Sequence, residues 1–378
     1  MPHRQRVVTY GISTFAAATI TIAALLQPWR TGDPVPPPPL VQVVSKRAVD
    51  VVFAVDTTGS MGGLIDGAKR TVWSIATHIR KTEPNADLRI GLVAYRDVGD
   101  DYVTRDFGLT GDLDAVFVEL SGFRAEGGGD APEDVDAALD DVLHKMQWRG
   151  EAKKLVFLVG DAPPASRGDV PRFDVLAREA AGKQIILNTI RCGEDAATEV
   201  AWQQIASLAH GQFSTIRQDG GVQQIATPYD DKLAELSARI DSAAVIVGDD
   251  RERAEYHRKM AVTAAAPAAA NADRAAYFAG EGASGELRAK QDLVGGVANG
   301  TMAIEATPPE ALPADLRGLG KAALKEEIGK RVAKRKADQR ALNDLAKQRD
   351  EYLTKQSAKA GSTGFDDQVN AAIAAQLK

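Results

Sequence analysis

The sequence is poor in cysteine and histidine and has no excess of positive charge, and each shortage excludes a class of protein. Cys192 is the only cysteine among 378 residues, which rules out an intrachain disulfide and a zinc site built from cysteines. The five histidines form no HExxH motif, and the phosphate-binding motif GxxxxGK[ST] is absent. A net charge of −6, without a strongly basic domain, argues against general nucleic-acid binding.

The chain does contain enough apolar sequence for a sizeable core. Apolar residues make up 44% of the chain and charged residues 26%, proportions that are typical of a folded protein rather than a disordered one. A length of 378 residues exceeds that of one ordinary domain. We therefore expect one α/β domain accompanied by further segments.

The first residues resemble a membrane-targeting segment. His3, Arg4 and Arg6 precede Val7 to Leu26, a stretch of 20 residues without a formal charge. That length suits a membrane span, and the leading arginines favour a cytoplasmic N-terminus. A cleaved secretory signal has the same layout, but no clean A-x-A site follows, so an uncleaved signal anchor is favoured. The remaining alternative is a buried helix of a soluble protein.

A proline-rich segment follows, over Thr31 to Pro39. Its composition favours extended polyproline II, a semi-rigid spacer, although an ordinary disordered linker has the same composition. Either interpretation places a domain boundary near residue 45. The expected location is the cytoplasmic membrane, crossed once, with the following domain outside the cytoplasm or secreted.

From residue 49 onwards, apolar runs of strand length alternate with amphipathic helical patterns. We expect buried strands at 49–55, 88–95, 155–160, 184–190 and 213–216, with a short edge strand near 102–107. Helices are expected at 61–81, 112–120, 132–146, 172–181 and 197–209. This alternation predicts a doubly wound, mostly parallel sheet flanked by helices.

Oxygen-bearing side chains gather where two of these strands end. Asp56, Thr58 and Ser60 follow the first strand, and Asp161 ends the strand at 155–160. Asp130 lies in a glycine-rich loop before the helix expected near Pro132. Ligands of such sheets bind beyond the carboxyl ends of the strands, and neighbouring carboxylates need a cation to offset their repulsion. The pattern predicts a site for Mg²⁺, with Mn²⁺ or Ca²⁺ as alternatives. A simple helix cap by Asp56 and Ser60 is the competing interpretation.

The segment from about 49 to 218 resembles a von Willebrand factor type A domain. Asp56-x-Thr58-x-Ser60 is similar to the D-x-S-x-S motif of that family's metal-ion-dependent adhesion site (MIDAS), with a conservative threonine. The resemblance implies that Asp161 is the family's later aspartate and that Asp130 takes the place of its intermediate threonine. In the family, neutral hydroxyls leave the cation free to accept a partner's carboxylate. Asp130 departs from that pattern, because an anionic ligand would blunt the attraction; it could instead cap the following helix.

The rest of the chain is expected to be largely helical. The predicted division is 1–27 signal anchor or signal peptide, 28–45 proline-rich linker, 46–220 type A domain, 221–260 helical extension, 261–312 Ala/Gly-rich linker or irregular region, and 313–378 charged helical C-terminal region. The charged helix over 321–355 suits a coiled coil or a partner-binding arm, or a solvated helix packed on its own domain.

Together these features predict a binding module rather than an enzyme. The module would bind a divalent cation and a protein ligand, through an acidic side chain of that ligand bridged by the metal, and would meet the membrane through its N-terminal helix. One alternative is a metal-dependent hydrolase using the same carboxylates, although no histidine is placed as a general base. Another is a cytoplasmic accessory scaffold. No nucleic acid is expected as a partner, and the sequence predicts no oligomeric state.

Overall fold

The structure is a computed structural model that describes residues 47–129, 132–221, 225–279, 288–357 and 364–377. The candidate membrane segment at 7–26 and the linker at 28–45 lie outside these residues. Within them, no helix combines the length and the apolar character that crossing a membrane requires.

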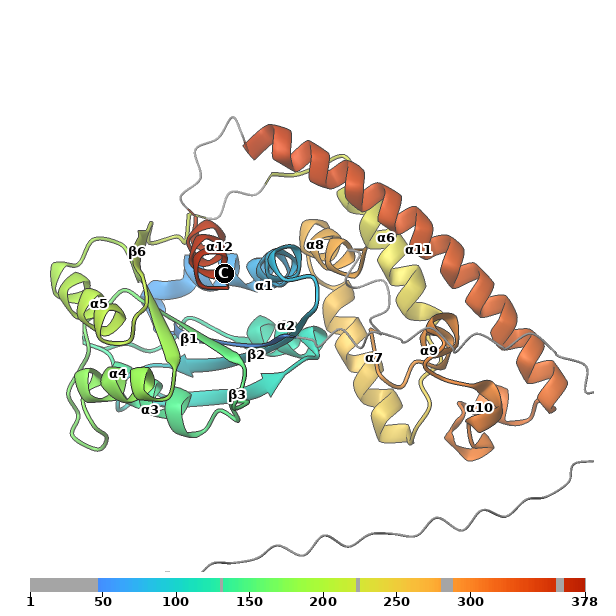
Figure 1. The fold of residues 1–378 in the computed structure, drawn as a ribbon, viewed down its shortest axis with the longest axis horizontal. Coiled ribbons are helices and arrows are strands. Elements are labelled where there is room, and N and C mark those ends of the chain that lie inside the picture. Colours follow the sequence, from blue (N-terminus) through green and yellow to red (C-terminus); the bar gives the residue numbers. More distant parts are fainter. Residues whose placement is uncertain (1–46, 130–131, 222–224, 280–287, 358–363, 378) are drawn as a thin grey trace, which may run out of the picture. The chain divides into compact units, whose positions relative to one another are not determined.

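A six-stranded sheet forms the centre of the fold (Figure 1). Its strands are β1 (Arg47–Asp56), β2 (Ala86–Tyr95), β3 (Thr104–Thr110), β4 (Lys153–Gly160), β5 (Ile185–Cys192) and β6 (Phe213–Ile216), in the order β3-β2-β1-β4-β5-β6. β3 pairs antiparallel with β2 at one edge, and every other pairing is parallel. The structure confirms the predicted doubly wound, mostly parallel sheet.

The apolar run of β1 reflects burial on both faces of the sheet. Val49, Val51 and Phe53 point into the core beneath one helical layer, whereas Val52 and Ala54 point into the core beneath the other. The first layer contains α1 (Gly62–Thr82) and α2 (Leu113–Gly122). The second contains α3 (Val135–His144), α4 (Phe173–Gly182) and α5 (Ala196–Leu208). A central parallel strand needs such a continuous apolar sequence because helices cover both of its sides.

The last helix of the chain completes the first layer. α12 (Phe365–Gln376) packs beside α1, and its Val369 and Ile373 are fully buried in the same core (Figure 1). The backbone N–H of Phe365 donates to the carbonyl of Gly220 at 3.0 Å. The chain therefore leaves the sheet domain near Gly220 and returns to the same place about 140 residues later.

We expect Ile373→Val to destabilise the whole sheet domain by about 0.5–1.5 kcal/mol, because it removes one methyl group from a filled core. Urea denaturation of the full chain, followed by tryptophan fluorescence, measures the change. The exposed Ala371 on the same helix provides the control. Ala371→Ser is expected to stay within about 0.5 kcal/mol of the wild type. Equal effects of the two substitutions would contradict the placement of α12 in the core.

The residues between Gly220 and Gly364 form a largely helical region. Its helices are α6 (Asp230–Ser242), α7 (Asp250–Ala264), α8 (Ala268–Ala279), α9 (Leu293–Asn299), α10 (Ala314–Arg317) and α11 (Lys321–Ser357). The alanine-rich stretch expected to be linker or irregular is helical in α8, which begins directly after Pro267. Alanine has the highest helix propensity, and proline is tolerated at a helix start, so the composition suits a helix.

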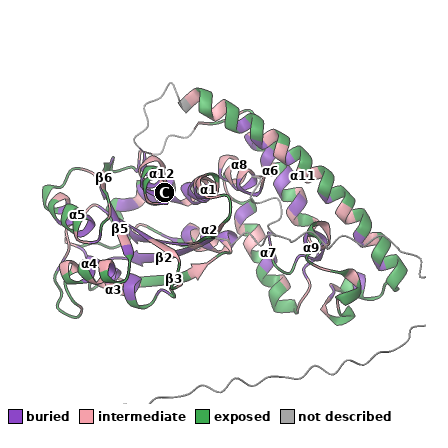
Figure 2. Ribbon diagram, viewed as in Figure 1, coloured by how far each residue is buried: buried purple, intermediate pink, exposed green. Residues whose placement is uncertain are grey.

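α11 packs on its own region. It contacts α6, α8 and α9, and it buries Ile328, Leu342 and Ala346 against them while its outer side stays exposed (Figure 2). Of the interpretations drawn from its sequence, the structure supports a solvated helix packed within the chain rather than a coiled coil.

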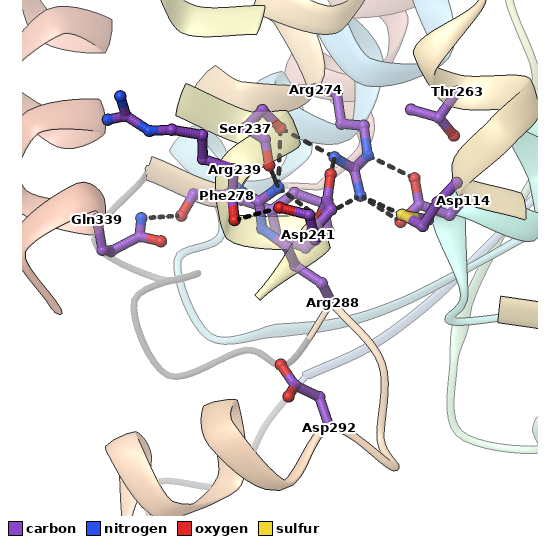
Figure 3. Close-up of polar contacts among 12 residues, drawn as sticks. Asp114, Ser237, Arg239, Asp241, Thr263, Arg274, Phe278, Arg288, Asp292 and Gln339 are labelled. Carbon is purple, nitrogen blue, oxygen red and sulfur yellow. Dashed lines mark hydrogen bonds and ion pairs between the residues drawn. The ribbon is translucent and has the colours of Figure 1, made fainter. Parts of the chain in front are cut away.

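A buried ion network joins this helical region to the sheet domain (Figure 3). Arg274 on α8 donates from Nε to Oδ1 of Asp114 on α2 at 2.6 Å and from Nη1 to Oδ2 of Asp241 on α6 at 2.7 Å. Arg288 donates from Nη1 to the other oxygen of Asp241 at 2.9 Å. Arg274 is 1% exposed and Asp114 is 2% exposed. Charges buried this deeply require partners, which each of them has here.

Candidate metal centre

The loop after β1 holds three of the predicted ligands in a compact turn. Oδ1 of Asp56 accepts hydrogen bonds from the backbone N–H of Thr58 at 2.8 Å and from its hydroxyl at 2.7 Å. The hydroxyls of Thr58 and Ser60 lie 3.4 Å apart. The 3₁₀ turn Gly59–Met61 and helix α1 follow, and neither is capped by a side chain. The interpretation of Asp56 and Ser60 as a helix cap is therefore wrong.

Asp161 lies beside this turn because its strand is the neighbour of β1. Val55 of β1 pairs with Val159 of β4, so the two strands end together at the carboxyl edge of the sheet. Burial, together with the charge of Asp161, raises the pKa of Asp56 to about 7. The side chain of Gln218 donates to Asp161, and it also reaches the carbonyl of Ser60 at 3.4 Å. The structure thus brings Asp56, Thr58, Ser60 and Asp161 to one place.

The glycine loop at 127–129 closes over the same turn. The N–H of Gly59 donates to the carbonyl of Gly127 at 3.2 Å, and Gly127 and Gly128 have φ values of +75° and +76°. A Cβ atom on Gly128 would lie 2.8 Å from Cβ of Thr58, so a side chain does not fit there. Glycine is needed both for the left-handed backbone and for the close approach.

Asp130 itself lies outside the described residues, so the structure gives no position for it. The alternative role considered for it, capping the next helix, belongs to Asp134. That residue is the N-cap of α3, and its carboxylate accepts from the N–H of Ala137 at 2.9 Å. The helix begins at Val135 rather than near Pro132, as the sequence had suggested.

Glu133 is a site residue that the sequence analysis missed. It is 4% exposed. A Cβ atom added to Gly128 would lie 3.3 Å from Oε1 of Glu133 and 2.8 Å from Cβ of Thr58, so the carboxylate of Glu133 lies near Thr58. Its backbone is fixed to the loop after β4, because its N–H donates to Pro163 and its carbonyl accepts from Ala165. Burial raises its pKa to about 8, with further contributions from nearby acidic groups, first among them Asp56. The sequence signal was its place in the loop between Gly129 and α3, which the expected helix start at Pro132 concealed.

Two buried oxygens in this group have no hydrogen-bond partner among the described residues. They are Oδ2 of Asp56, on a residue that is 0% exposed, and Oε2 of Glu133. An unpartnered buried carboxylate oxygen is costly, and neighbouring carboxylates repel one another. A hard divalent cation, which takes oxygen ligands, would relieve both costs. The residues present therefore fit such an ion.

Carboxylates alone do not form a ready-made ligand cluster here. Among the described residues, no three acidic, histidine or cysteine side chains converge closely enough to hold an ion by themselves. The hydroxyls of Thr58 and Ser60 would have to supply part of the coordination. Mg²⁺ commonly completes such a set with water.

Comparison with known protein families agrees with the fold. Residues 50–228 match the family model of the von Willebrand factor A domain. This part of the chain is a von Willebrand factor A domain, as its D-x-T-x-S motif predicted. The match ends before α12, although α12 packs in the same core.

Two curated proteins resemble part of the chain. A putative ariadne-like RING finger protein of Acanthamoeba polyphaga mimivirus is 30% identical over 135 residues, which are 36% of this chain and 13% of that protein. The alpha-protein kinase vwkA of Dictyostelium discoideum is 30% identical over 123 residues, 32% of this chain and 19% of that protein. The chain therefore spans less than a fifth of the length of either relative.

Among solved structures, the conserved hypothetical protein BatB from Bacteroides thetaiotaomicron is 14% identical, with a TM-score of 0.35, over 45% of this chain and 90% of that one. Proximal thread matrix protein 1 from the mussel byssus, described with a zinc-occupied MIDAS motif, is 15% identical. It has a TM-score of 0.36 and covers 46% of this chain and 42% of its own.

Proposed function

We propose that this chain is a protein-binding module whose type A domain depends on a divalent cation, Mg²⁺ or a similar ion. The observation that carries the proposal is the pair of buried, unpartnered oxygens, one on Asp56 and one on Glu133, beside two hydroxyls and Asp161. Type A domains are generally interaction modules, which supports binding rather than catalysis as the role of this site.

Each residue of the site would have its own role in binding the cation. Asp56 uses Oδ1 to fix Thr58 and keeps Oδ2 for the ion. Glu133 would approach from the loop before α3, with the hydroxyls of Thr58 and Ser60 between them. Asp161 accepts a hydrogen bond from Gln218 and would bind the cation directly or through a water molecule. The cation would supply a positive centre that neutralises these carboxylates and offers a coordination position to a partner.

Metal-dependent hydrolysis by the same carboxylates is less well supported. A hydrolase needs a general base beside an open metal position. His144, on α3, is bound to Asp140 and Glu179 at 2.9 Å each, and His78 lies on α1 next to α12, so neither is part of the site. Glu133 would lie near the ion, but we assign its carboxylate to binding the ion rather than to acting as a base.

Isothermal titration calorimetry of the full chain tests the cation site. We expect Mg²⁺ or Mn²⁺ to bind with one-to-one stoichiometry in chelator-stripped protein. Capture of binding proteins with and without chelator would then identify partners. Failure of Mg²⁺, Mn²⁺ and Ca²⁺ to bind would remove the basis of the proposal.

The location is proposed from the N-terminal sequence alone. Residues 7–26, with the basic residues before them and the proline-rich segment after them, support display of the domain outside the cytoplasmic membrane. We expect a phosphatase reporter fused after residue 45 to be active, because that enzyme folds only after export, whereas a cytoplasmic reporter at the same point stays inactive. The reverse result would favour the cytoplasmic scaffold.

A further inference from the structure

The surface around the candidate metal centre is strongly acidic. We define the metal face as the loops at 56–60, 96–103, 124–129, 132–134, 161–169 and 217–219. It holds ten acidic side chains and four arginines, and no lysine. The acidic residues are Asp56, Asp97, Asp100, Asp101, Glu126, Glu133, Asp134, Asp161, Asp169 and Asp219.

Hydrogen bonds tie these loops into a single surface. The N–H of Gly128 donates to the carboxylate of Asp100 at 3.1 Å, and the N–H of Glu126 donates to the carbonyl of Thr57 at 3.1 Å. The N–H of Asp134 donates to the carbonyl of Arg96 at 3.2 Å. These loops therefore lie together beyond the carboxyl end of β1.

Three of the four arginines of the metal face are buried or paired with one of its carboxylates, whereas Arg124 is exposed and donates to the backbone carbonyls of Ser121 and Phe123. Arg96 is buried and donates to the carbonyls of Thr57 and Arg124. Arg167 is bound to the carboxylate of Asp97, and Arg217 to Asp219 at 2.8 Å. By contrast, three exposed acidic residues have no ion-pair partner among the described residues: Asp101, Glu126 and Asp169.

One divalent cation leaves the face negative. A bound cation favours the ionised forms of Asp56 and Glu133, and ten ionised acidic groups with four arginines and one doubly charged ion leave an excess of four negative charges. The carboxylates nearest the proposed ion are those of Asp56, Glu133 and Asp161. They carry three negative charges against the two positive charges of the ion. A partner's carboxylate would add a fourth to this group, whereas a cationic side chain would be attracted by the rim.

An apolar contact lies within the same rim. Val98 is 54% exposed, between the acidic residues Asp97 and Asp100 in the loop after β2. Lysine and arginine side chains bury their methylene stems against apolar groups while the charged end meets an acid. Val98, with Asp101 in the same loop, suits such a side chain.

We propose that the partner of the metal face is a basic protein segment, rich in lysine or arginine, rather than an acidic one. This inference rests on the proposed function for the cation. The unpartnered buried oxygens of Asp56 and Glu133 mark the place where the ion sits, and the surplus of exposed acids around it selects the charge of the partner. Neutral backbone carbonyls of the segment would be the groups that approach the ion.

Two fluorescent decapeptides of glycine and serine test the inference, one carrying three lysines and the other three glutamates. Anisotropy of each peptide is followed as the full chain is added, in saturating Mg²⁺ at low salt and again at higher salt. We expect the lysine peptide to bind at least tenfold more tightly than the glutamate peptide. This difference should shrink as salt screens the exposed charges.

The double variant Asp101→Asn/Asp169→Asn is expected to weaken binding of the lysine peptide about 3- to 10-fold, because it removes two exposed charges of the rim. Glu255→Gln/Glu310→Gln changes the net charge equally at exposed positions outside the metal face and should leave binding unchanged. Tighter binding of the glutamate peptide, equal binding of both peptides, no binding of either, or equal effects of the two double variants would each overturn the inference. Calorimetry with Mg²⁺ alone on the same samples reports separately on the cation site.

Discussion

Asp56→Ala is expected to abolish the stabilisation that Mg²⁺ or Mn²⁺ gives to the wild-type chain. A ligand that binds only the folded state stabilises it by about 2.7 kcal/mol at a hundred times its dissociation constant. In the wild type this should raise the melting temperature by several degrees. Asp56 is the buried carboxylate at the centre of the turn, so its loss removes a ligand and the organiser of Thr58 together.

Two further substitutions separate the loss of a ligand from a loss of folding. Asp56→Asn keeps an oxygen that accepts from Thr58, so the variant should fold, yet it replaces the unpartnered Oδ2 by an NH2 group, which cannot ligate a cation. Asp101→Asn, at the exposed rim, should keep the full rise in melting temperature. Differential scanning calorimetry with and without chelator measures all three. A metal-dependent rise that survives in Asp56→Asn would refute the assignment of Asp56 as a ligand.

The parts of the site that could be predicted from sequence are those fixed by strands. A strand buried on both sides needs a continuous apolar run, so 49–55 was recognisable, and the polar residues directly after it had to lie at the carboxyl edge. Asp161 ends another such run. Because β4 pairs with β1, the two predicted groups meet.

The place of Glu133 at the site could not be predicted in the same way. It depends on the path of a loop whose Gly127 and Gly128 have left-handed backbone conformations and on the bonds of Glu133 to the β4 loop. Those bonds join residues about 30 positions apart, and no local pattern specifies them. A glutamate next to a proline before a helix resembles an ordinary first-turn residue.

The position of α12 and the ion network were hidden for a related reason. The periodicity of 365–376 indicates a helix with an apolar side but not the surface that it covers. Arg274 stands in an alanine-rich helix, where a lone arginine is usually a solvated surface residue. Its burial follows only from the packing of α8 between α1, α6 and α11.

Arg274→Met is expected to destabilise the chain by about 3–5 kcal/mol, because it leaves Asp114 buried without its cationic partner and takes one of two from Asp241. Burial acts to lower the pKa of Arg274, but Asp114 and Asp241 outweigh it and hold that pKa well above its usual value, so the side chain is charged. Its guanidinium also lies over the ring of Phe278, 5.2 Å from the centroid. Urea denaturation measures the loss.

A double-mutant cycle distinguishes a lost partner from lost packing. Asp114→Asn combined with Arg274→Met should cost clearly less than the sum of the two single substitutions, since the double variant no longer buries an unpaired charge on α2. Arg258→Met, at an exposed position of α7, is the matched control and should change stability by no more than about 0.5 kcal/mol. Additive single effects, or an Arg274→Met cost equal to that of the control, would show that the network does not hold the helical region on the sheet domain.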